Sequence, residues 1–474
     1  MSLVKNSILY TIGNILPKLV NIIFVPIYSY YLSPSDYGIT ASMGVFSSIL
    51  ILIYTLGLDR SLNRLYYDYK TEEQRKSFLG TITIFIYATA LIITFLVFIY
   101  HTLINTIFSS IQFYPFYRIA IFTALLNVLV VVPSMYLKIT EKASSFVLLN
   151  LSRFIITSVL IVILVVYNKQ GAIGKMNAGL YSIAIIFPVY FIINYKIINF
   201  RFDLSILKAA LYFSLPMLPA TLSAWIINLS DRIFIDKYFS QVDVGLYSMG
   251  YTLAGFVLII SSSFFLAYSP YFYKIVNTVD EDQAKAKLGK ANMYFIVIVI
   301  ITSFSIAFLS KELIILFLSK KYLNSYIFIP IISLAYFFGQ TSGLINLFIY
   351  QKKKSSVVMW IVIITALINI GLNYLLIPRI GVIGAAWATL ISFAFQFIVG
   401  YLVSRKYYFI PFNWYIIIPL LISGIVMYSI FEYVIILTPI VSLIVKVIIL
   451  SFFILFGTYK YSDELKLIFV KNKK

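Results

Sequence analysis

The fold is decided by stretches such as residues 77–100, SFLGTITIFIYATALIITFLVFIY, which contain no Asp, Glu, Lys or Arg. A run of about 20 apolar residues is long enough to cross the hydrocarbon core of a bilayer as a helix. Helices are expected because every backbone N–H and C=O must be paired inside hydrocarbon, and these runs lack the alternation of a strand. Because comparable runs recur along the chain, the sequence predicts an all-α polytopic membrane protein.

Fourteen such runs are separated by polar interruptions. Hydrophobic residues make up 61% of the 474-residue chain and charged residues 11%, whereas soluble proteins average about 25% charged residues. The first run continues directly into this pattern, so we expect a retained helix and not a cleaved signal peptide. The expected spans are 8–32, 39–58, 77–100, 116–137, 143–166, 178–195, 209–230, 245–268, 291–310, 326–350, 355–377, 381–403, 413–431 and 438–458.

The formal charge of +20 is explained mostly by topology. If the amino terminus is cytoplasmic, 25 of the 37 Lys and Arg residues fall in cytoplasmic segments and 9 in the opposite segments. Basic residues concentrate on the cytoplasmic side of membrane proteins, so both termini are expected in the cytoplasm. With the positive charge accounted for in this way, nucleic acid is not expected as a partner.

An internal repeat predicts two lobes. Shifting the chain by 207 residues aligns Asn21, Tyr31, Ser33, Asp36 and Gly38 with Asn228, Tyr238, Ser240, Asp243 and Gly245. At an offset of 211, Lys142, Ser144, Ser145 and Val147 align with Lys353, Ser355, Ser356 and Val358. We expect parallel six-helix lobes at 1–204 and 205–410 around a central cavity, a recurrent transporter plan. Helices thirteen and fourteen and a basic cytoplasmic tail occupy 411–474.

Polar residues inside the apolar runs mark the expected cavity. Asn14, Lys18 and Asn21 share one face of the first helix, beside Pro17. The matching face of the seventh helix carries Thr221, Trp225 and Asn228 and continues to Arg232. We interpret these faces as lining a water-filled cavity where Lys18 meets an anion. The alternative is a lysine that reaches the interface and asparagines that bond between helices.

Two further cations lie inside predicted helices. Arg153, near the middle of the fifth helix, is either a second anion contact or a charge near the inner boundary. For Lys446, in the fourteenth helix, we favour a structural role or a position at a groove. Asn369 and Asn373 share a face of the eleventh helix, where they meet substrate or bond between helices. The carboxylates fall in loops or near helix ends, so a positive cavity and an anionic substrate are expected.

Most enzyme chemistry finds no support in the sequence. There are no cysteines and a single histidine, His101, so Cys- and His-based metal sites are not expected. A phosphate loop of the ATPase type is absent. Asp280, Glu281 and Asp282 resemble the metal motif of sugar transferases but favour a solvated charged loop. We predict no catalytic residue, metal or cofactor, and leave open a coupling ion, H⁺ or Na⁺.

Several segments together resemble the polysaccharide-export flippases of the O-antigen type. Their superfamily also contains multidrug exporters and lipid II flippases. The residues that carry the resemblance are Leu32–Gly38 (LSPSDYG), Asp231–Ile235 (DRIFI), Val244–Tyr247 (VGLY), Asn369–Pro378 (NIGLNYLLIP) and Gly381–Thr389 (GVIGAAWAT). In the first three segments, the resemblance marks Asp36, Gly38, Asp231, Arg232 and Gly245 as loop-signature or gating positions, and Asp243, which the repeat aligns with Asp36, is included with them.

The resemblance implies a flippase for an undecaprenyl-diphosphate-linked oligosaccharide. The two bundles would form a V in a bacterial inner membrane and work by alternating access, with a glycan polymerase or chain-length protein as a possible partner. Lipid II flippases carry arginines in their first two helices, whereas 39–58 contains no Lys or Arg, which disfavours that substrate. A cation-coupled multidrug exporter and, more weakly, a membrane glycan polymerase or transferase remain alternatives.

Overall fold

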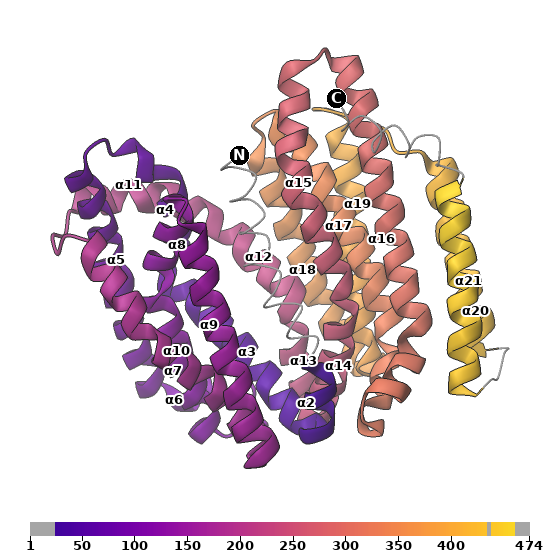
Figure 1. Cartoon of the computed structure of the whole chain (residues 1–474), viewed down its shortest axis with the longest axis horizontal. Helices are drawn as coiled ribbons and strands as arrows, with labels where there is room; N and C mark the ends of the chain where they lie inside the picture. Colours follow the sequence, from indigo (N-terminus) through magenta and orange to yellow (C-terminus); the bar gives the residue numbers. More distant parts are fainter. Residues whose placement is uncertain (1–23, 434–437, 460–474) are drawn as a thin grey trace. The chain divides into compact units, whose positions relative to one another are not determined.

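A computed structural model of the chain describes residues 24–433 and 438–459, and this part is helical with no β-strand (Figure 1). Twelve of its helical segments are long and apolar enough to cross a membrane. The predicted class, an all-α multi-pass membrane protein, is therefore confirmed.

The helices group into two compact units. The first comprises Met1–Ser248 with Asn373–Pro378, and the second Met249–Leu372 with Arg379–Lys474, each within the described residues. The first unit contains α2 (Val25–Tyr31), α3 (Pro34–Thr55), α4 (Leu58–Leu65), η1 (Tyr66–Asp68), α5 (Glu72–Ile99), α6 (His101–Ile104), η2 (Phe113–Tyr117), α7 (Arg118–Leu129), α8 (Val131–Ile139), α9 (Ala143–Ile161), η3 (Val162–Tyr167), α10 (Gly171–Ile197), α11 (Leu204–Ser214), η4 (Leu215–Met217), α12 (Leu218–Leu229), α13 (Asp231–Tyr238) and the first part of α14 (Gln241–Ala254).

The second unit is built from long helices and one short 3₁₀ segment. It contains α15 (Phe256–Thr278), α16 (Glu281–Phe317), η5 (Lys320–Ile327), α17 (Ile329–Gln351), most of α18 (Ser355–Ile380), α19 (Ile383–Ser404), α20 (Trp414–Tyr433) and α21 (Pro439–Tyr459). Within it, α17 packs against both α16 and α19, and α16 also contacts α20 and α21.

The twelve membrane-spanning segments coincide with the second to thirteenth predicted spans. The apolar helix α21 is not among the twelve, and most of the predicted first span, 8–32, lies outside the described residues. A count of fourteen, the lobe boundaries at 204/205 and 410/411 and the V arrangement therefore stay predictions.

Repeat-related sequences begin α3 and α14 in the same way. Ser33 caps α3: its hydroxyl accepts a hydrogen bond from the Asp36 backbone N–H (3.0 Å), and the Asp36 carboxylate accepts one from the Ser33 N–H (3.1 Å). At α14, the Ser240 hydroxyl donates to the Asp243 carboxylate (2.5 Å) and accepts from its N–H (3.4 Å). Such caps satisfy backbone N–H groups that have no partner within the helix. At these positions the repeat therefore corresponds to two helix starts that share a serine–aspartate contact, while the two-lobe plan stays a prediction.

The helix α16 is longer than the predicted span 291–310, because its charged first turns are helical as well. Asp280 caps it by accepting a hydrogen bond from the Gln283 N–H (3.0 Å), and Lys285 pairs with Glu281 one turn away (2.6 Å). At 1.5 Å per residue its 37 residues extend about 55 Å, whereas the hydrocarbon core is about 30 Å thick.

A sharp turn ends α3 and directs two charged residues inward. Leu56 and Gly57 both have positive φ values, 47° and 71°, which glycine adopts readily and leucine rarely. The turn starts α4, which packs against α8 and α11. Asp59 and Arg60, in the first turn of α4, are thereby brought to the pocket described next.

Candidate functional site

A pocket of about 490 Å³ lies entirely within the first unit, and we call it the basic pocket. Its walls come from α3, α4, α7, α8, α9 and α12 and the turns between them. The lining residues are Ser48, Ile51, Leu52, Thr55, Gly57, Asp59, Arg60, Asn127, Val130, Val131, Ser134, Met135, Lys138, Arg153, Thr221 and Trp225.

The basic pocket carries three cations, Arg60, Lys138 and Arg153, against one carboxylate, Asp59. Asp59 interacts electrostatically with Lys138, whose Nζ also lies 4.7 Å from the centre of the Phe146 ring. Among the described residues, no carboxylate lies within 4.0 Å of the guanidinium nitrogens of Arg60 or Arg153. The pocket therefore carries a formal excess of two positive charges in a half-apolar setting, which favours an anionic ligand.

Three residues that the sequence predicted for substrate contact meet in the basic pocket. Arg153 enters from α9, and Thr221 and Trp225 enter from α12, although 68 residues separate Arg153 from Thr221. The indole Nε1 of Trp225 donates to the hydroxyl of Ser48 (2.8 Å), and Thr221 donates to the Met217 carbonyl (3.0 Å). Their geometry agrees with one cavity, while their role in binding stays a prediction.

The other predicted cavity residues lie elsewhere. Asn14, Lys18 and Asn21 lie outside the described residues. Asn228 does not line the basic pocket; its amide donates to the Ala224 carbonyl of its own helix (2.7 Å). Asn369 donates to the Ser392 hydroxyl (3.3 Å), and Asn369 and Asn373 are both fully buried on α18. For Asn369 the geometry agrees with the interhelical alternative.

Arg60 and Lys138 were missed as site candidates. From sequence, both were assigned as cytoplasmic charges that set the topology, because both border loops. One signal was present: Gly57, which favours a turn, immediately precedes the amphipathic segment Leu58–Leu65. A short amphipathic helix after a turn folds back onto the protein, so its first charges need not face solvent.

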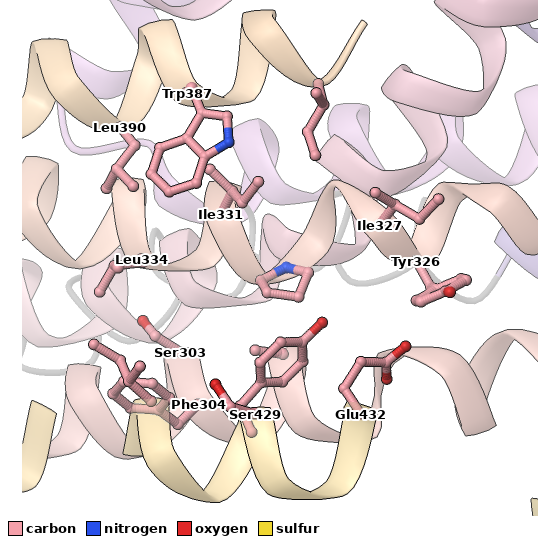
Figure 2. A pocket seen from close by; sticks show the side chains of 15 residues that line it. Ser303, Phe304, Tyr326, Ile327, Ile331, Leu334, Trp387, Leu390, Ser429 and Glu432 are labelled. Carbon is pink, nitrogen blue, oxygen red and sulfur yellow. The ribbon is translucent and has the colours of Figure 1, made fainter. Parts of the chain in front are cut away.

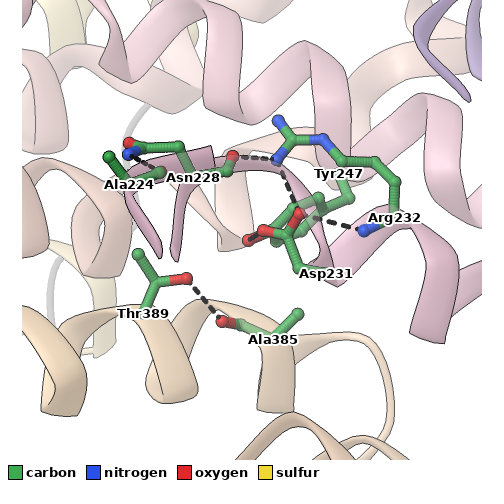
Figure 3. Close-up of polar contacts among 7 residues, drawn as sticks. All are labelled: Ala224, Asn228, Asp231, Arg232, Tyr247, Ala385 and Thr389. Carbon is green, nitrogen blue, oxygen red and sulfur yellow. Dashed lines mark hydrogen bonds and ion pairs between the residues drawn. The ribbon is translucent and has the colours of Figure 1, made fainter. Parts of the chain in front are cut away.

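Asp231 and Arg232 form a buried ion pair, with 2.6 Å between carboxylate and guanidinium. Figure 3 shows Asp231 also contacting Tyr247, whose hydroxyl donates to its second oxygen (2.5 Å). Arg232 donates to the Asn228 carbonyl as well (2.7 Å), and its guanidinium lies 5.3 Å from the Tyr247 ring centre. This charge is compensated internally, unlike that of Arg153.

The predicted loop-signature glycines face each other, and we call their contact the glycine crossing. A Cβ added to Gly38 would lie 1.9 Å from the Gln241 carbonyl oxygen, and one added to Gly245 would lie 1.8 Å from that of Pro34. No side chain tolerates such distances, so only glycine allows the starts of α3 and α14 to approach this closely. Nearby, the Asp36 carboxylate accepts a hydrogen bond from the Ala172 N–H (3.1 Å).

A polar network lies beside the glycine crossing. The Gln241 amide accepts from the Ser42 hydroxyl (3.2 Å) and donates to the Ser110 hydroxyl (3.2 Å). Both Gln241 and Ser110 donate to the buried Asp236 carboxylate. The network joins α3, the segment before η2, α13 and α14, and so reinforces the same contact.

Lys446 has a structural partner in the second unit. Its Nζ lies 2.9 Å from Oε1 of Glu312, which also accepts a hydrogen bond from the Ser442 hydroxyl (2.6 Å). Lys446 and Glu312 are each only 4% exposed. The sequence places Glu312 near a helix end and favours a structural role or a groove for Lys446; the pair, which joins α16 to α21, agrees with the structural role.

Comparison with known proteins adds a family and a fold. The family model described as polysaccharide biosynthesis protein matches residues 30–327. A Haemophilus influenzae protein of the Lsg locus is 25% identical over 400 residues, which cover 81% of this chain and 96% of that protein. An uncharacterized membrane protein of the same organism is 23% identical over 330 residues, 68% of this chain and 78% of the relative.

Two solved structures share the arrangement of helices. The lipid II flippase MurJ, in an inward closed conformation, superposes with a TM-score of 0.77 at 18% identity, over 97% of this chain and all of that chain. The Vibrio cholerae MATE transporter VcmN, in its bent form, gives 0.57 at 11% identity, over 90% of this chain and 99% of that chain. At these identities the similarity shows the fold alone. The match over residues 30–327 shows that the chain belongs to the polysaccharide biosynthesis protein family.

Proposed function

We propose that this protein is a flippase that moves an undecaprenyl-diphosphate-linked oligosaccharide from the cytoplasmic to the outer leaflet of a bacterial inner membrane. The oligosaccharide would be a repeat unit of O-antigen, capsule or exopolysaccharide. The observation that carries the proposal is the basic pocket, in which Arg60 and Arg153 have no carboxylate partner within the described part of the chain.

The chemistry of the ligand matches the pocket. A diphosphate is expensive to bring into a low-dielectric setting, and three cations offset that cost through charge-assisted hydrogen bonds. Sugar hydroxyls find donors and acceptors in Ser134, Asn127 and Thr221, and the Trp225 ring offers an apolar face. A prenyl tail needs no protein cavity, because the bilayer itself dissolves it.

The position of the pocket along α3 fits loading from the cytoplasm. Under the predicted topology, Arg60 and Lys138 lie at the cytoplasmic ends of their helices. Thr55 lines the pocket, whereas Gly38 lies 17 residues earlier on α3, about 25 Å along the helix axis. We propose that the glycine crossing closes the outer side while substrate enters from the inner side, and that it separates when the substrate leaves.

Complementation of a strain lacking the gene tests the proposal. We expect Arg153→Ala to abolish most surface glycan, Arg153→Lys to restore part of it, and the double variant Arg60→Ala/Lys138→Ala to lose export. Arg201→Ala is the matched control, because the Arg201 side chain is 81% exposed and does not line the pocket. Normal surface glycan from Arg153→Ala, present at the wild-type level in the membrane, would overturn the assignment.

The same strains separate the two alternative substrates. A multidrug exporter would leave surface glycan intact and change resistance to cationic drugs. A lipid II flippase would be required for peptidoglycan synthesis, so its loss would cause lysis and not merely a bare surface. An excess of positive charge in the pocket argues against cationic drugs, because like charges repel.

A further inference from the structure

A second pocket, of about 440 Å³, lies wholly within the second unit, and we call it the apolar pocket. It is bounded by α16, η5, α17, α19 and α20. Its lining residues are Ser303, Phe304, Ala307, Tyr326, Ile327, Pro330, Ile331, Leu334, Ile383, Trp387, Leu390, Ile425, Tyr428, Ser429 and Glu432. The volume falls within the range of small-molecule sites, roughly 300–1,000 Å³.

The two ends of the apolar pocket differ in polarity. Figure 2 shows Tyr326 and Glu432 at one end and Leu334, Leu390 and Phe304 at the other. At the polar end, Lys311 Nζ lies 3.6 Å from the Glu432 carboxylate and 5.3 Å from the centre of the Tyr326 ring. The Lys311 side chain is 40% exposed and that of Glu432 13%. Lys311 and Glu432 thus form an ion pair at the polar end of an otherwise mostly apolar slot.

A buried hydroxyl provides a second, independent observation. Ser303 is 2% exposed, lines the pocket, and its Oγ has no hydrogen-bond partner within the described residues. Buried hydroxyls are almost always hydrogen-bonded, and serines in helices commonly bond to the carbonyl four residues earlier. Since Ser303 makes no such bond, its hydroxyl is available to a polar atom of a ligand in the slot.

We propose that the apolar pocket binds a phospholipid whose headgroup carries both a phosphate and a primary amine, as phosphatidylethanolamine does. The ammonium pairs with Glu432 and the phosphate with Lys311, so the headgroup replaces a loose internal pair by two charge-assisted contacts. One acyl chain follows Ile331, Leu334 and Leu390. Ser303 lies eight residues before Lys311 on α16, about 12 Å deeper, where ester oxygens and not headgroup atoms accept its hydrogen bond.

Charge selects this occupant over other lipids. A purely anionic headgroup such as that of phosphatidylglycerol meets Lys311 but is repelled by Glu432. Under the predicted topology the end of α16 opposite its charged start lies on the outer side, so the lipid comes from the outer leaflet. The site does not depend on the basic pocket, and its test requires no transport.

Native mass spectrometry of the purified full-length protein tests the site. The probes are dioleoyl-phosphatidylethanolamine, -phosphatidylcholine and -phosphatidylglycerol, offered at equal concentrations. We expect the wild-type protein to retain phosphatidylethanolamine about tenfold over phosphatidylglycerol. Glu432→Gln should reduce that preference at least about fivefold, and Lys311→Met should weaken retention of all three lipids. Glu281→Gln is the matched control: it removes one carboxylate of another Lys–Glu pair, outside the pocket, and should leave the preference unchanged.

Three outcomes would overturn the proposal. The first is equal retention of phosphatidylethanolamine and phosphatidylglycerol by the wild-type protein. The second is an unchanged preference in folded Glu432→Gln. If that variant does not fold, Leu334→Trp takes its place, because its larger apolar side chain fills the slot. This variant should retain less of every phospholipid, and full retention would contradict the site. The third is displacement of phosphatidylethanolamine by an equal concentration of undecaprenyl diphosphate, which would assign the slot to the transported lipid.

Discussion

Arg153 in the first unit and Lys446 in the second both interrupt long apolar runs, yet the protein treats the two charges differently. Lys446 is 4% exposed, and Glu312 and Ser442 complete a compact polar cluster around it. Arg153 lines an open pocket with Arg60 and Lys138, and no described carboxylate lies within ion-pair distance. A charge that the fold neutralises is part of the structure and cannot lose its partner without cost, whereas a charge left without a counter-ion is available to a ligand. The predictions below test this distinction.

The largest effect is expected from breaking the buried pair. Glu312→Ala leaves the Lys446 ammonium buried without its carboxylate, and such changes cost about 3–5 kcal/mol of stability. Thermal and denaturant unfolding of the purified protein in detergent measure the loss. The double variant Glu312→Leu/Lys446→Leu should recover most of it, because two apolar side chains of similar size replace both charges.

In the same unfolding experiment, Arg153→Ala should leave the stability nearly unchanged. With no described carboxylate at Arg153 to leave unpaired, we expect a change within about 0.5 kcal/mol. A loss comparable to that of Glu312→Ala would contradict the distinction between the two cations, because it would show that Arg153 holds the fold together.

For ligand binding we expect the opposite ranking: changing Arg153 should have a large effect, and changing the Glu312–Lys446 pair none. Removing one charge-assisted contact to a diphosphate costs about 1.5–3 kcal/mol, so Arg153→Ala should bind undecaprenyl diphosphate about 10–150-fold more weakly. Arg153→Lys should fall between that variant and the wild-type protein, because the ammonium keeps the charge but loses the planar fork. Isothermal titration in detergent measures the affinity, and the Glu312→Leu/Lys446→Leu double variant should bind as the wild-type protein does.

The glycine crossing allows the same kind of test at a contact without charges, by comparing Gly38 with Gly44 on the same helix. Gly38→Ala places a methyl group 1.9 Å from the Gln241 carbonyl oxygen, and relieving such overpacking costs about 1–3 kcal/mol. Gly44→Ala, on the same helix with no atom within 4 Å of the added Cβ, should instead stabilise the protein by about 0.5–1 kcal/mol. Unfolding measurements on both variants check the pair, and equal effects would mean that the crossing is not tightly packed in solution.

The smallest effect is expected at the partly exposed pair Lys311–Glu432. Its side chains are 40% and 13% exposed and 3.6 Å apart, so the attraction is weaker and more screened than that of Lys446 and Glu312 at 2.9 Å. Glu432→Gln should change the free energy of unfolding by less than about 1 kcal/mol. A loss as large as that of Glu312→Ala would show that this pair holds α20 in place and is not available to a lipid headgroup.

The helices could be predicted from sequence because hydrocarbon leaves the backbone few choices. Apolar runs such as 77–100 and 355–377 became α5 and α18 with shifts of a few residues at their ends. Charged helical extensions could not be predicted in this way. The apolar run that predicts a span stops at the first charged residues. The helix α16 nevertheless begins earlier and includes Glu281 and Lys285.

The site could be predicted only in part. Arg153, Thr221 and Trp225 stood out because polar groups are rare inside apolar runs, and the structure brings them into one pocket. Arg60 and Lys138 did not stand out, since charges beside loops are common, and the inward direction of Arg60 depends on the Leu56–Gly57 turn. The Glu312–Lys446 pair joins residues 134 apart, a tertiary contact that no local pattern encodes.

That separation has a consequence for how the protein is made. A ribosome adds about 5–20 residues per second, so the 134 residues between Glu312 and Lys446 take about 7–27 s to synthesise. Throughout that interval the chain carries the Glu312 carboxylate while its partner Lys446 does not yet exist. A nascent chain interrupted before α21 therefore retains an uncompensated acid in a long apolar helix. Helix α21 thus supplies the counter-charge that α16 lacks until α21 is made.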